Sequence, residues 1–426
     1  MIVAYAIVAA ASLGADRPHI LVEGGKFRPL PLAIAPPKAE GEAVSVAREI
    51  EDVLNVDLAV SGIFQVLDKK SFLADAKDGF TPTSIGWSRW TDVGAEALIK
   101  ARVAVEAGTA KAEFHLFTVT SSREDLSTVL SGPSTEARKI AHRFADEVFH
   151  FYTVEEGSFQ TGMAYVREVK RDHRIWVSDW DGHGGRPITE AGLALLPSWS
   201  RDGTMVAFTS YRSGNPDLYV TSLNGGPARA IVHVGRLATG LVFGPDRKHI
   251  AYSLGDDYGS QVYIADLDGS SPRQLTHGFG INTSPTWSPD GSQVAYVSDS
   301  AGSPQIYVIA SAGGSPTRIT FQGNYNQEPR WSPRGDVIAF TARDERNKFD
   351  LFTVDPKTTQ IKRLTQDQGN NKEPSYAPNG RMIAFTSDRG GKWQLWVMSA
   401  DGNTQRQMTF DREGEIATPS WGPKSP

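Results

Sequence analysis

The stretch PTWSPDGSQVAYVS, residues 285–298, decides the fold because related stretches recur along the second half of the chain. They are PSWSRDGTMVAFTS from Pro197, LVFGPDRKHIAYSL from Leu241, PRWSPRGDVIAFTA from Pro329 and PSYAPNGRMIAFTS from Pro374. The first aromatic residue of each recurs at steps of 44, 44, 44 and 45 residues, at Trp199, Phe243, Trp287, Trp331 and Tyr376. A repeat of about 44 residues is typical of the blades of a β-propeller.

Each repeat reads as four short strands. Apolar and polar residues alternate in VAYVS (residues 294–298) and in IYVIA (residues 306–310), which is the period of two expected of a half-buried strand. In the S-P-D-G turn, proline presets φ, aspartate accepts backbone hydrogen bonds and glycine takes the left-handed position. Asp181-Gly182, Asp268-Gly269 and Asp401-Gly402 are expected to form turns between third and fourth strands.

An incomplete repeat precedes the five complete ones. Residues 162–166, 174–179 and 186–189 match the second, third and fourth strands of a blade. The missing first strand occurs at the C-terminus, in residues 418–423, where Trp421 follows Tyr376 by 45 residues. The sequence therefore predicts a six-bladed β-propeller over residues 157–426. Its C-terminal strand is expected to close the ring, which removes the open sheet edge.

Residues 30–156 carry no repeat and predict a small α/β domain. A strand is expected at residues 30–35, and a hairpin is expected from residues 97–105 and 110–119. Residues 40–60 predict an amphipathic helix, with apolar positions at Val44, Ala47, Ile50, Val53 and Leu54. Ser134 is expected to cap a last helix, whose apolar positions are Ala137, Ile140, Ala141, Phe144, Val148 and Phe151.

The N-terminus has the pattern of an export signal. The first eleven residues are apolar and small residues follow at Gly14 and Ala15, which predicts a signal peptide over residues 1–15. No Lys or Arg precedes Arg17, so a buried N-terminal strand is the alternative. Residues 16–29 contain Pro18, Gly24 and Gly25 and are expected to form a flexible arm.

Composition narrows the classes of partner. The formal net charge is -5 and no clustered run of Lys or Arg occurs, which argues against nucleic-acid binding. The chain has no cysteine, which excludes disulfides, thiolate metal sites and a cysteine nucleophile. No stretch of eighteen apolar residues is present, so no membrane insertion is expected. A monomer without cofactor is predicted.

Catalytic motifs are missing from the sequence. It contains no nucleophile elbow, H-E-x-x-H motif, Walker loop or dinucleotide fingerprint. The nine histidines are dispersed, so neither catalytic nor metal-binding residues are predicted. Glu328 and Glu373 occupy equivalent positions, interpreted as loop positions, in adjacent repeats. As a carboxylate pair they leave one alternative open, a hydrolase or lyase acting on an oligomeric substrate in the channel.

The arrangement resembles the TolB family of the Tol-Pal system of Gram-negative bacteria. The P-x-W-S-P-D-G-x-x-[IV]-A-[FY] repeats are similar to those of that family, although such repeats also occur in accessory domains of peptidases. An accessory domain would leave the α/β domain unexplained. More specific are AEALI at residues 95–99 followed by Arg102-Val103, AHRFAD at residues 141–146, and GSF at residues 157–159 leading into MAYV at residues 163–166. The resemblance covers essentially the full chain.

The resemblance implies a non-catalytic periplasmic adaptor that supports outer-membrane integrity, constriction during cell division and protein import. It also implies that the lipoprotein Pal binds the propeller face where loops lead into the innermost strands, and that the N-terminal arm docks on the inner-membrane protein TolA. The candidate Pal-binding positions are Leu196, Gly240, Asn282, Thr283, Ser284, Glu328, Glu373 and Thr418. The candidate arm positions are Asp16, Arg17, His19, Ile20 and Val22. We hypothesise that the arm and the propeller site are energetically coupled.

Overall fold

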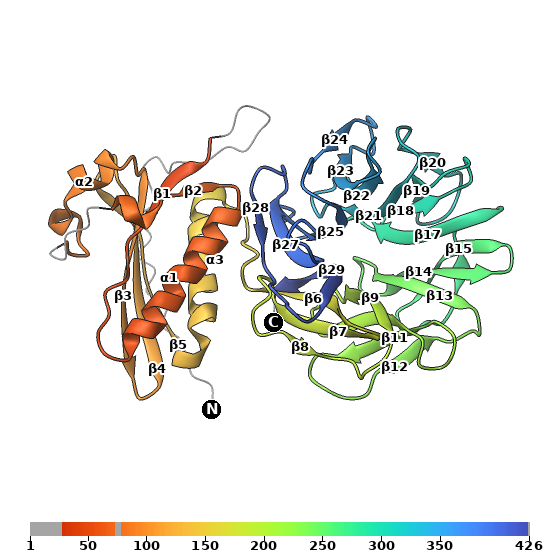
Figure 1. Cartoon of the computed structure of the whole chain (residues 1–426), viewed down its shortest axis with the longest axis horizontal. Helices are drawn as coiled ribbons and strands as arrows, with labels where there is room; N and C mark the ends of the chain where they lie inside the picture. Colours follow the sequence, from red (N-terminus) through yellow and green to blue (C-terminus); the bar gives the residue numbers. More distant parts are fainter. Residues whose placement is uncertain (1–27, 73–77, 425–426) are drawn as a thin grey trace.

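A five-stranded sheet with helices is followed by a series of further β-sheets in the computed structural model (Figure 1). The structure describes residues 28–72 and 78–424. The predicted signal peptide and residues 16–27 of the predicted arm, including all five candidate arm positions, lie outside the described residues. None of the helices in the two described ranges is both long and apolar enough to cross a membrane.

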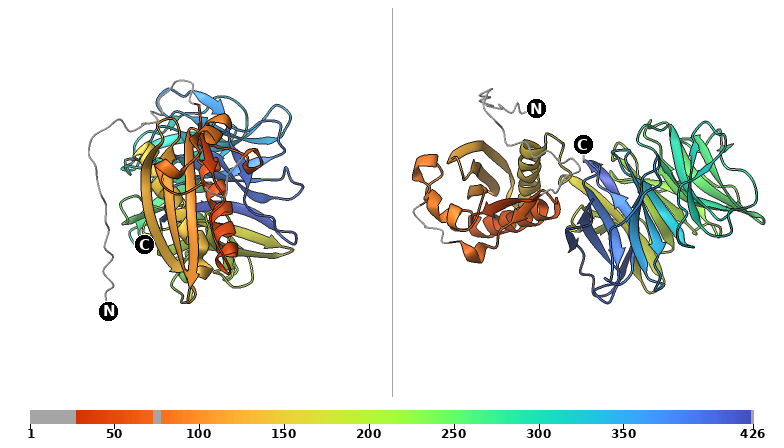
Figure 2. Two further views of the ribbon diagram at one scale, coloured as in Figure 1. Left: turned by 90° about the vertical axis from the view of Figure 1, so that its left-hand side faces the viewer. Right: turned by 90° about the horizontal axis from the view of Figure 1, so that it is seen from above.

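The N-terminal unit has its two long helices on one face of its sheet and a short helix on the other. Its elements are β1 (Leu30–Ile34), α1 (Ala43–Val60), β2 (Phe64–Val66), α2 (Trp87–Asp92), β3 (Ala97–Glu106), β4 (Thr109–Thr118), β5 (Arg123–Pro133) and α3 (Ala137–Thr153). The sheet order is β2-β1-β3-β4-β5, with β1 parallel to both of its neighbours. Helices α1 and α3 lie between this sheet and the C-terminal sheets (Figures 1 and 2).

Apolar spacing explains how the two long helices are placed. Ile50 and Leu54 of α1 and Phe144 and Val148 of α3 are buried in one core against the sheet. Burying each such side chain contributes about 1.5–3 kcal/mol relative to leaving it exposed. The predicted strand, hairpin and helices are therefore present, with shifted ends. The sequence patterns did not indicate β2, β5 or α2.

Two local predictions in this unit are wrong. Ser134 does not cap α3, because residues Ser134–Glu136 form a separate 3-10 turn and the helix begins at Ala137 without a side-chain cap. Val44 was counted on the apolar face of the first helix, but its side chain is exposed. Because α1 begins at Ala43, Val44 lies in its first turn.

The C-terminal part follows the repeat. Its strands are β6 (Thr161–Val169), β7 (Asp172–Asp179), β8 (Arg186–Pro187), β9 (Ala194–Trp199), β10 (Met205–Ser210), β11 (Asp217–Ser222), β12 (Arg229–Val232), β13 (Leu237–Phe243), β14 (His249–Asp256), β15 (Gly259–Asp266), β16 (Arg273–Gln274) and β17 (Gly280–Trp287). The chain continues with β18 (Gln293–Ser298), β19 (Gln305–Ala310), β20 (Thr317–Arg318), β21 (Asn326–Trp331), β22 (Ile338–Arg343), β23 (Phe349–Val354), β24 (Ile361–Arg363), β25 (Asn371–Tyr376), β26 (Met382–Ser387), β27 (Gln394–Ser399), β28 (Gln405–Gln407) and β29 (Glu415–Lys424).

Antiparallel pairing joins these strands into sheets with a propeller-like arrangement (Figure 1). Four sheets have four strands each, and an eight-stranded sheet contains two repeats joined by a short parallel pairing of β15 with β17. The last strand, β29, pairs with β6, so that Trp421 lies opposite Met163. An N-terminal domain followed by a β-propeller is therefore confirmed.

The predicted turn mechanism is confirmed in the Ser288–Gln293 segment. The Asp290 carboxylate accepts the N–H of Ser292 (3.0 Å) and the hydroxyl of Ser288 (2.6 Å). Gly291 has φ of 73°, a left-handed conformation that glycine adopts without a steric penalty. The turn therefore fixes the register of the hairpin between β17 and β18.

The two units share a continuous interface. Trp180 and Trp421 of the propeller belong to the same buried core as α1 and α3. Just after α3, Glu155 accepts hydrogen bonds from Arg381 (2.7 Å) and Arg334 (3.1 Å). Burial alone would raise the pKa of Glu155, but these two guanidinium groups lower it below its usual value. These ion pairs connect the end of α3 to the propeller.

Candidate protein-binding face

Equivalent residues in the innermost strands share an unusual backbone conformation. The innermost strands are β9, β13, β17, β21, β25 and β29, and each contains a register shift against its neighbouring strand. One residue beside each shift has positive φ: Leu196 (54°), Gly240 (67°), Ser284 (55°), Glu328 (57°), Glu373 (60°) and Thr418 (46°). We call these the bulge residues, because an extra residue in one strand produces a β-bulge.

The bulge residues coincide with candidate binding positions, but their placement in loops was wrong. All of them lie inside strands and are half-buried. Five are followed directly by proline, which lacks the N–H needed for the ladder and is tolerated in strands at bulges. The sequence pattern placed the strand start at this proline, whereas the ladder begins a few residues earlier.

Left-handed conformation costs a residue with a side chain about 1–2 kcal/mol, so these positions need compensation. Some of it comes from hydrogen bonds between consecutive repeats. The N–H of Glu373 donates to Glu328 Oε2 (3.0 Å), and the N–H of Thr418 donates to Glu373 Oε2 (2.6 Å). The N–H of Gly240 donates to Thr209 Oγ1 (3.4 Å). Each bulge of this kind connects its strand to the preceding repeat.

Glu328 and Glu373 form a chain of acceptors across three innermost strands. Glu328 also accepts the hydroxyl of Thr341 (2.7 Å), and Glu373 accepts that of Thr386 (2.9 Å). Burial, and next the charge of Glu328, raise the pKa of Glu373 to about 7. Since one oxygen of each carboxylate is committed to the next bulge, these groups hold strands together, which is a structural role rather than that of a free acid–base pair.

Asn282 and Thr283 differ in accessibility. Asn282 is buried, and its amide donates to Gln261 Oε1 of β15 (3.1 Å). Asn326 repeats this contact with Gln305 (2.8 Å). Thr283 is half-buried on β17 opposite Val297. Asn282 therefore positions β17 from inside, while Thr283 and the neighbouring Ser284 remain partly accessible.

Exposed apolar side chains gather on one side of the propeller. We define the inlet face as the loops that lead into the innermost strands, the first residues of those strands, and the loops that join second to third strands of each repeat. Every exposed large apolar residue among the described residues of the propeller lies there. These residues are Leu193, Tyr211, Val234, Leu237, Tyr258, Phe279, Ile281, Phe321 and Phe410.

Three phenylalanines are the most informative of this group. Phe279, Phe321 and Phe410 precede β17, β21 and β29 and are 87%, 61% and 73% exposed. Such a concentration of exposed apolar groups on one face is typical of an interaction site, so these residues are candidates for contact with a partner. Sequence reasoning missed these residues because it scored the loops for polar and catalytic groups. An apolar residue in an otherwise polar loop was the signal that could have identified them.

Positive charge and a small pocket accompany the aromatic residues. Lys372 Nζ lies 4.0 Å from the centroid of the Phe349 ring and 5.1 Å from the centroid of the Trp393 ring. These distances suit a cation–π interaction. Lys372, Glu373 and Trp393 line a pocket of about 230 Å³ beside β29. The inlet face therefore offers apolar anchors together with both signs of charge, a composition suited to recognising a protein.

Comparisons with known proteins agree with the fold and show which proteins the chain is similar to. A family model described as the TolB amino-terminal domain matches residues 18–124, and one described as the TolB beta propeller domain matches residues 149–425. A Tol-Pal system protein TolB from Anaeromyxobacter dehalogenans (strain 2CP-C) is 46% identical over 99% of this chain and 98% of its own length.

Two further relatives are similar over different extents. A Tol-Pal system protein TolB from Myxococcus xanthus (strain DK1622) is 49% identical over 47% of each chain. The crystal structure of TolB from Acinetobacter baumannii superposes with a TM-score of 0.81, covering 93% of this chain and 97% of that chain, at 24% identity. At that identity the structural likeness supports the fold alone.

Proposed function

The chain belongs to the TolB family of Tol-Pal system proteins, and from this premise we propose that it is a non-catalytic periplasmic adaptor. In this proposal the inlet face binds a Pal-like peptidoglycan-associated lipoprotein, and the N-terminal arm binds a TolA-like inner-membrane protein. The adaptor supports outer-membrane integrity and constriction during cell division. Residues 1–15 act as the signal peptide that directs export.

The proposed architecture is an α/β domain over residues 30–156 and a closed, six-bladed propeller over residues 157–426. Pairing of β29 with β6 supports closure, because it completes the first repeat with the last strand. Contacts from β25 to β29 support it further. The N–H of Thr418 donates to Glu373, and the N–H of Trp421 donates to Ser375 Oγ (2.9 Å). A closed ring of repeats presents its loops as one preorganised surface, which lowers the entropy cost of binding.

The gathering of exposed apolar side chains on the inlet face carries the binding proposal. Aromatic anchors at the centre of an interface commonly account for most of its affinity. Phe321 and Phe410 lie in loops that lead into β21 and β29, next to the strands that hold Glu328, Glu373 and Thr418. The bulge residues then set the shape of the surface, and the phenylalanines supply the contacts.

Calorimetric titration with the soluble domain of a Pal-like lipoprotein tests this proposal. Phe321→Ser and Phe410→Ser should each weaken binding by about tenfold or more, the loss expected of an aromatic anchor. Val129→Ser is the matched control, because Val129 is 53% exposed on β5 of the N-terminal unit. Circular dichroism establishes that each variant is folded. Equal affinity in all variants, or equal loss in the control, would disprove the assignment of the face.

Deletion of residues 16–27 tests the role of the arm. We expect binding to a TolA-like partner to be lost, because the proposal gives the arm all of that contact. The affinity for the Pal-like domain should change as well if the two sites are coupled. Unchanged affinity of the deletion variant for the Pal-like domain would show that the two binding sites are independent.

A further inference from the structure

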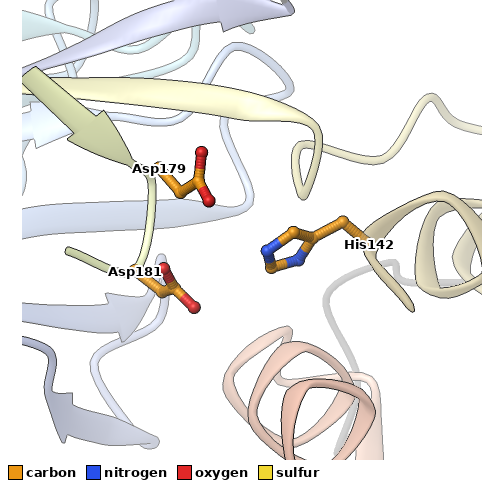
Figure 3. A group of neighbouring side chains, drawn as sticks. All are labelled: His142, Asp179 and Asp181. Atoms are coloured by element: carbon orange, nitrogen blue, oxygen red, sulfur yellow. The ribbon is translucent and has the colours of Figure 1, made fainter. Parts of the chain in front are cut away.

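Three ionisable side chains converge where α3 meets the propeller. His142 lies on α3, and Asp179 and Asp181 lie at the end of β7 and in the turn that follows it. One ligand atom from each, a ring nitrogen or a carboxylate oxygen, lies within 4.8 Å of the others. Figure 3 shows the His142 ring directed toward both aspartates. The cluster therefore joins the N-terminal unit to the propeller.

A carboxylate on α1 fixes the orientation of the His142 ring. Its Nδ1 is 2.7 Å from Asp57 Oδ2 on α1, and the two side chains are 3% and 0% exposed. The other ring nitrogen, Nε2, is buried and has no hydrogen-bond partner. When the carboxylate accepts the Nδ1 proton, the neutral ring presents the lone pair of Nε2. Metal-binding histidines are commonly oriented by a carboxylate in this way.

The turn that carries the two aspartates is rigid. Trp180, between them in sequence, is fully buried and stacks on Trp421 with ring centroids 5.8 Å apart and an interplanar angle of 4°. The N–H of Gly182 donates to the Asp179 carbonyl (2.9 Å), and the N–H of His183 donates to Asp181 Oδ1 (3.1 Å). The ligand atoms are thus placed before any ion arrives, which favours specific binding.

The cluster carries more negative than positive charge. Asp57, Asp179 and Asp181 contribute carboxylates, and Arg138 pairs with Asp181 Oδ2. Asp57 is fully buried, and Asp179 is half-buried at the end of β7. Buried charges in proteins are paired or coordinate metal ions. A bound cation would balance the excess of carboxylates over cationic groups in this cluster.

We propose that His142, Asp179 and Asp181 bind a divalent transition-metal ion of the Zn²⁺ class. An imidazole with carboxylates suits Zn²⁺ and similar ions, whereas Ca²⁺ and Mg²⁺ prefer sites made of oxygen ligands. Arg138 engages Oδ2 of Asp181, and a carboxylate oxygen can hold more than one partner, so Oδ1 can bind the ion beside the His183 N–H. The bound ion bridges α3 and the end of β7, and it thereby stabilises the interface between the two units.

Zinc titration of the full chain, stripped with a chelator and dialysed, tests the site. Calorimetry with zinc chloride should detect one saturable site that Asp179→Asn weakens at least about tenfold. The change keeps the size of the side chain and removes its charge. His249→Ala is the control for surface binding, because exposed His249 lies 2.5 Å from Asp246 on the propeller surface. It should leave the site intact.

A stability measurement separates metal binding from misfolding. With free zinc at a hundred times the dissociation constant, the folding equilibrium of the wild-type chain should shift by about 100-fold. Asp179→Asn should fold without zinc and show no such shift. Failure of the stripped wild-type chain to bind zinc would overturn the proposal and indicate a protonated His142 in place of the ion. Equal zinc affinity in Asp179→Asn, or loss of the site in His249→Ala, would also overturn it.

Discussion

Two arcs of the innermost strands have the same backbone and different chemistry. In the carboxylate arc, β21, β25 and β29, Glu328 and Glu373 each accept the N–H of the next bulge residue. In the neutral arc, β9, β13 and β17, the bulge residues are Leu196, Gly240 and Ser284. The left-handed backbone at these positions therefore belongs to the repeat and does not depend on the side chain.

Side-chain chemistry decides how firmly neighbouring repeats are connected. Thr341 and Thr386 in the carboxylate arc both donate to a glutamate. Of their counterparts in the neutral arc, Thr209 accepts only the distant N–H of Gly240 (3.4 Å), and Ser253 has a buried hydroxyl without a hydrogen-bond partner. The repeat thus supplies the same backbone conformation in both arcs. In the carboxylate arc, the glutamate side chains add hydrogen bonds that connect β21 to β25 and β25 to β29.

Removal of β29 should have the largest effect. Deleting residues 415–426 removes the partner of β6, the acceptor role of Glu373 toward Thr418, and the Trp421 ring that packs on Trp180. We expect the propeller to lose its cooperative thermal transition, measured by circular dichroism. Deleting residues 425–426 alone is the control and should leave the melting temperature unchanged. A normal transition in the longer deletion would show that β29 is dispensable.

Glu373→Ala should destabilise the carboxylate arc by about 2 kcal/mol, because the Thr418 N–H and the Thr386 hydroxyl lose their acceptor in a partly buried site. Urea unfolding measures the difference. Leu196→Ala truncates the equivalent bulge residue of the neutral arc and should cost less, since no hydrogen bond from the next repeat depends on its side chain. Equal losses at the two positions would erase the distinction between the arcs.

Gly240→Ala isolates the cost of the left-handed backbone, expected to be about 1 kcal/mol. An added Cβ at this position meets no atom within 4 Å, so crowding contributes nothing. Gly132→Ala on β5 is the control, because its Cβ would meet only Ile140 atoms at 3.8 Å. Urea unfolding should therefore show a loss for the first variant and little change for the second. Equal stability of Gly240→Ala and the wild-type chain would show that the backbone at residue 240 leaves the left-handed conformation without cost.

The smallest effect should be a pH dependence of Glu373→Gln. The pKa of Glu373 is raised from 4.5 to about 7, so folding favours its protonated form. Its stabilising contribution is complete below pH 4.5 and is lost as pH rises through 7. Glutamine does not titrate, so the variant should gain stability relative to the wild type between pH 5 and pH 8, by less than about 1 kcal/mol for a partly exposed group. A difference independent of pH would contradict the raised pKa.

The repeat was predictable because its signal is local. Aromatic spacing and S-P-D-G turns depend on residues close together in sequence, and they indicated the propeller and the strand at residues 418–423. The left-handed conformation of Glu328, Glu373 and Thr418 was not predictable, because residue type does not require it. It results from pairing with a neighbouring strand and from the proline that follows.

The candidate binding face and the proposed metal cluster were harder to predict for a different reason. Phe279, Phe321 and Phe410 belong to separate repeats and share a face of the propeller because each precedes an innermost strand. His142 and Asp179 lie in different structural units, and their meeting depends on how α3 packs against β7. Sequence reasoning found nine dispersed histidines and could not identify the one that packing brings beside carboxylates.

Pairing of β29 with β6 also sets the order of events when the protein is made. Thr161 cannot accept its hydrogen bond from Trp421 until residue 421 has been synthesised, because the indole N–H of Trp421 donates to the Thr161 hydroxyl (2.7 Å) across 260 residues of sequence. Contacts of such long range form late and slow folding. The first sheet of the propeller therefore cannot be completed before β29 is synthesised, and until then β6 lacks its partner on that side.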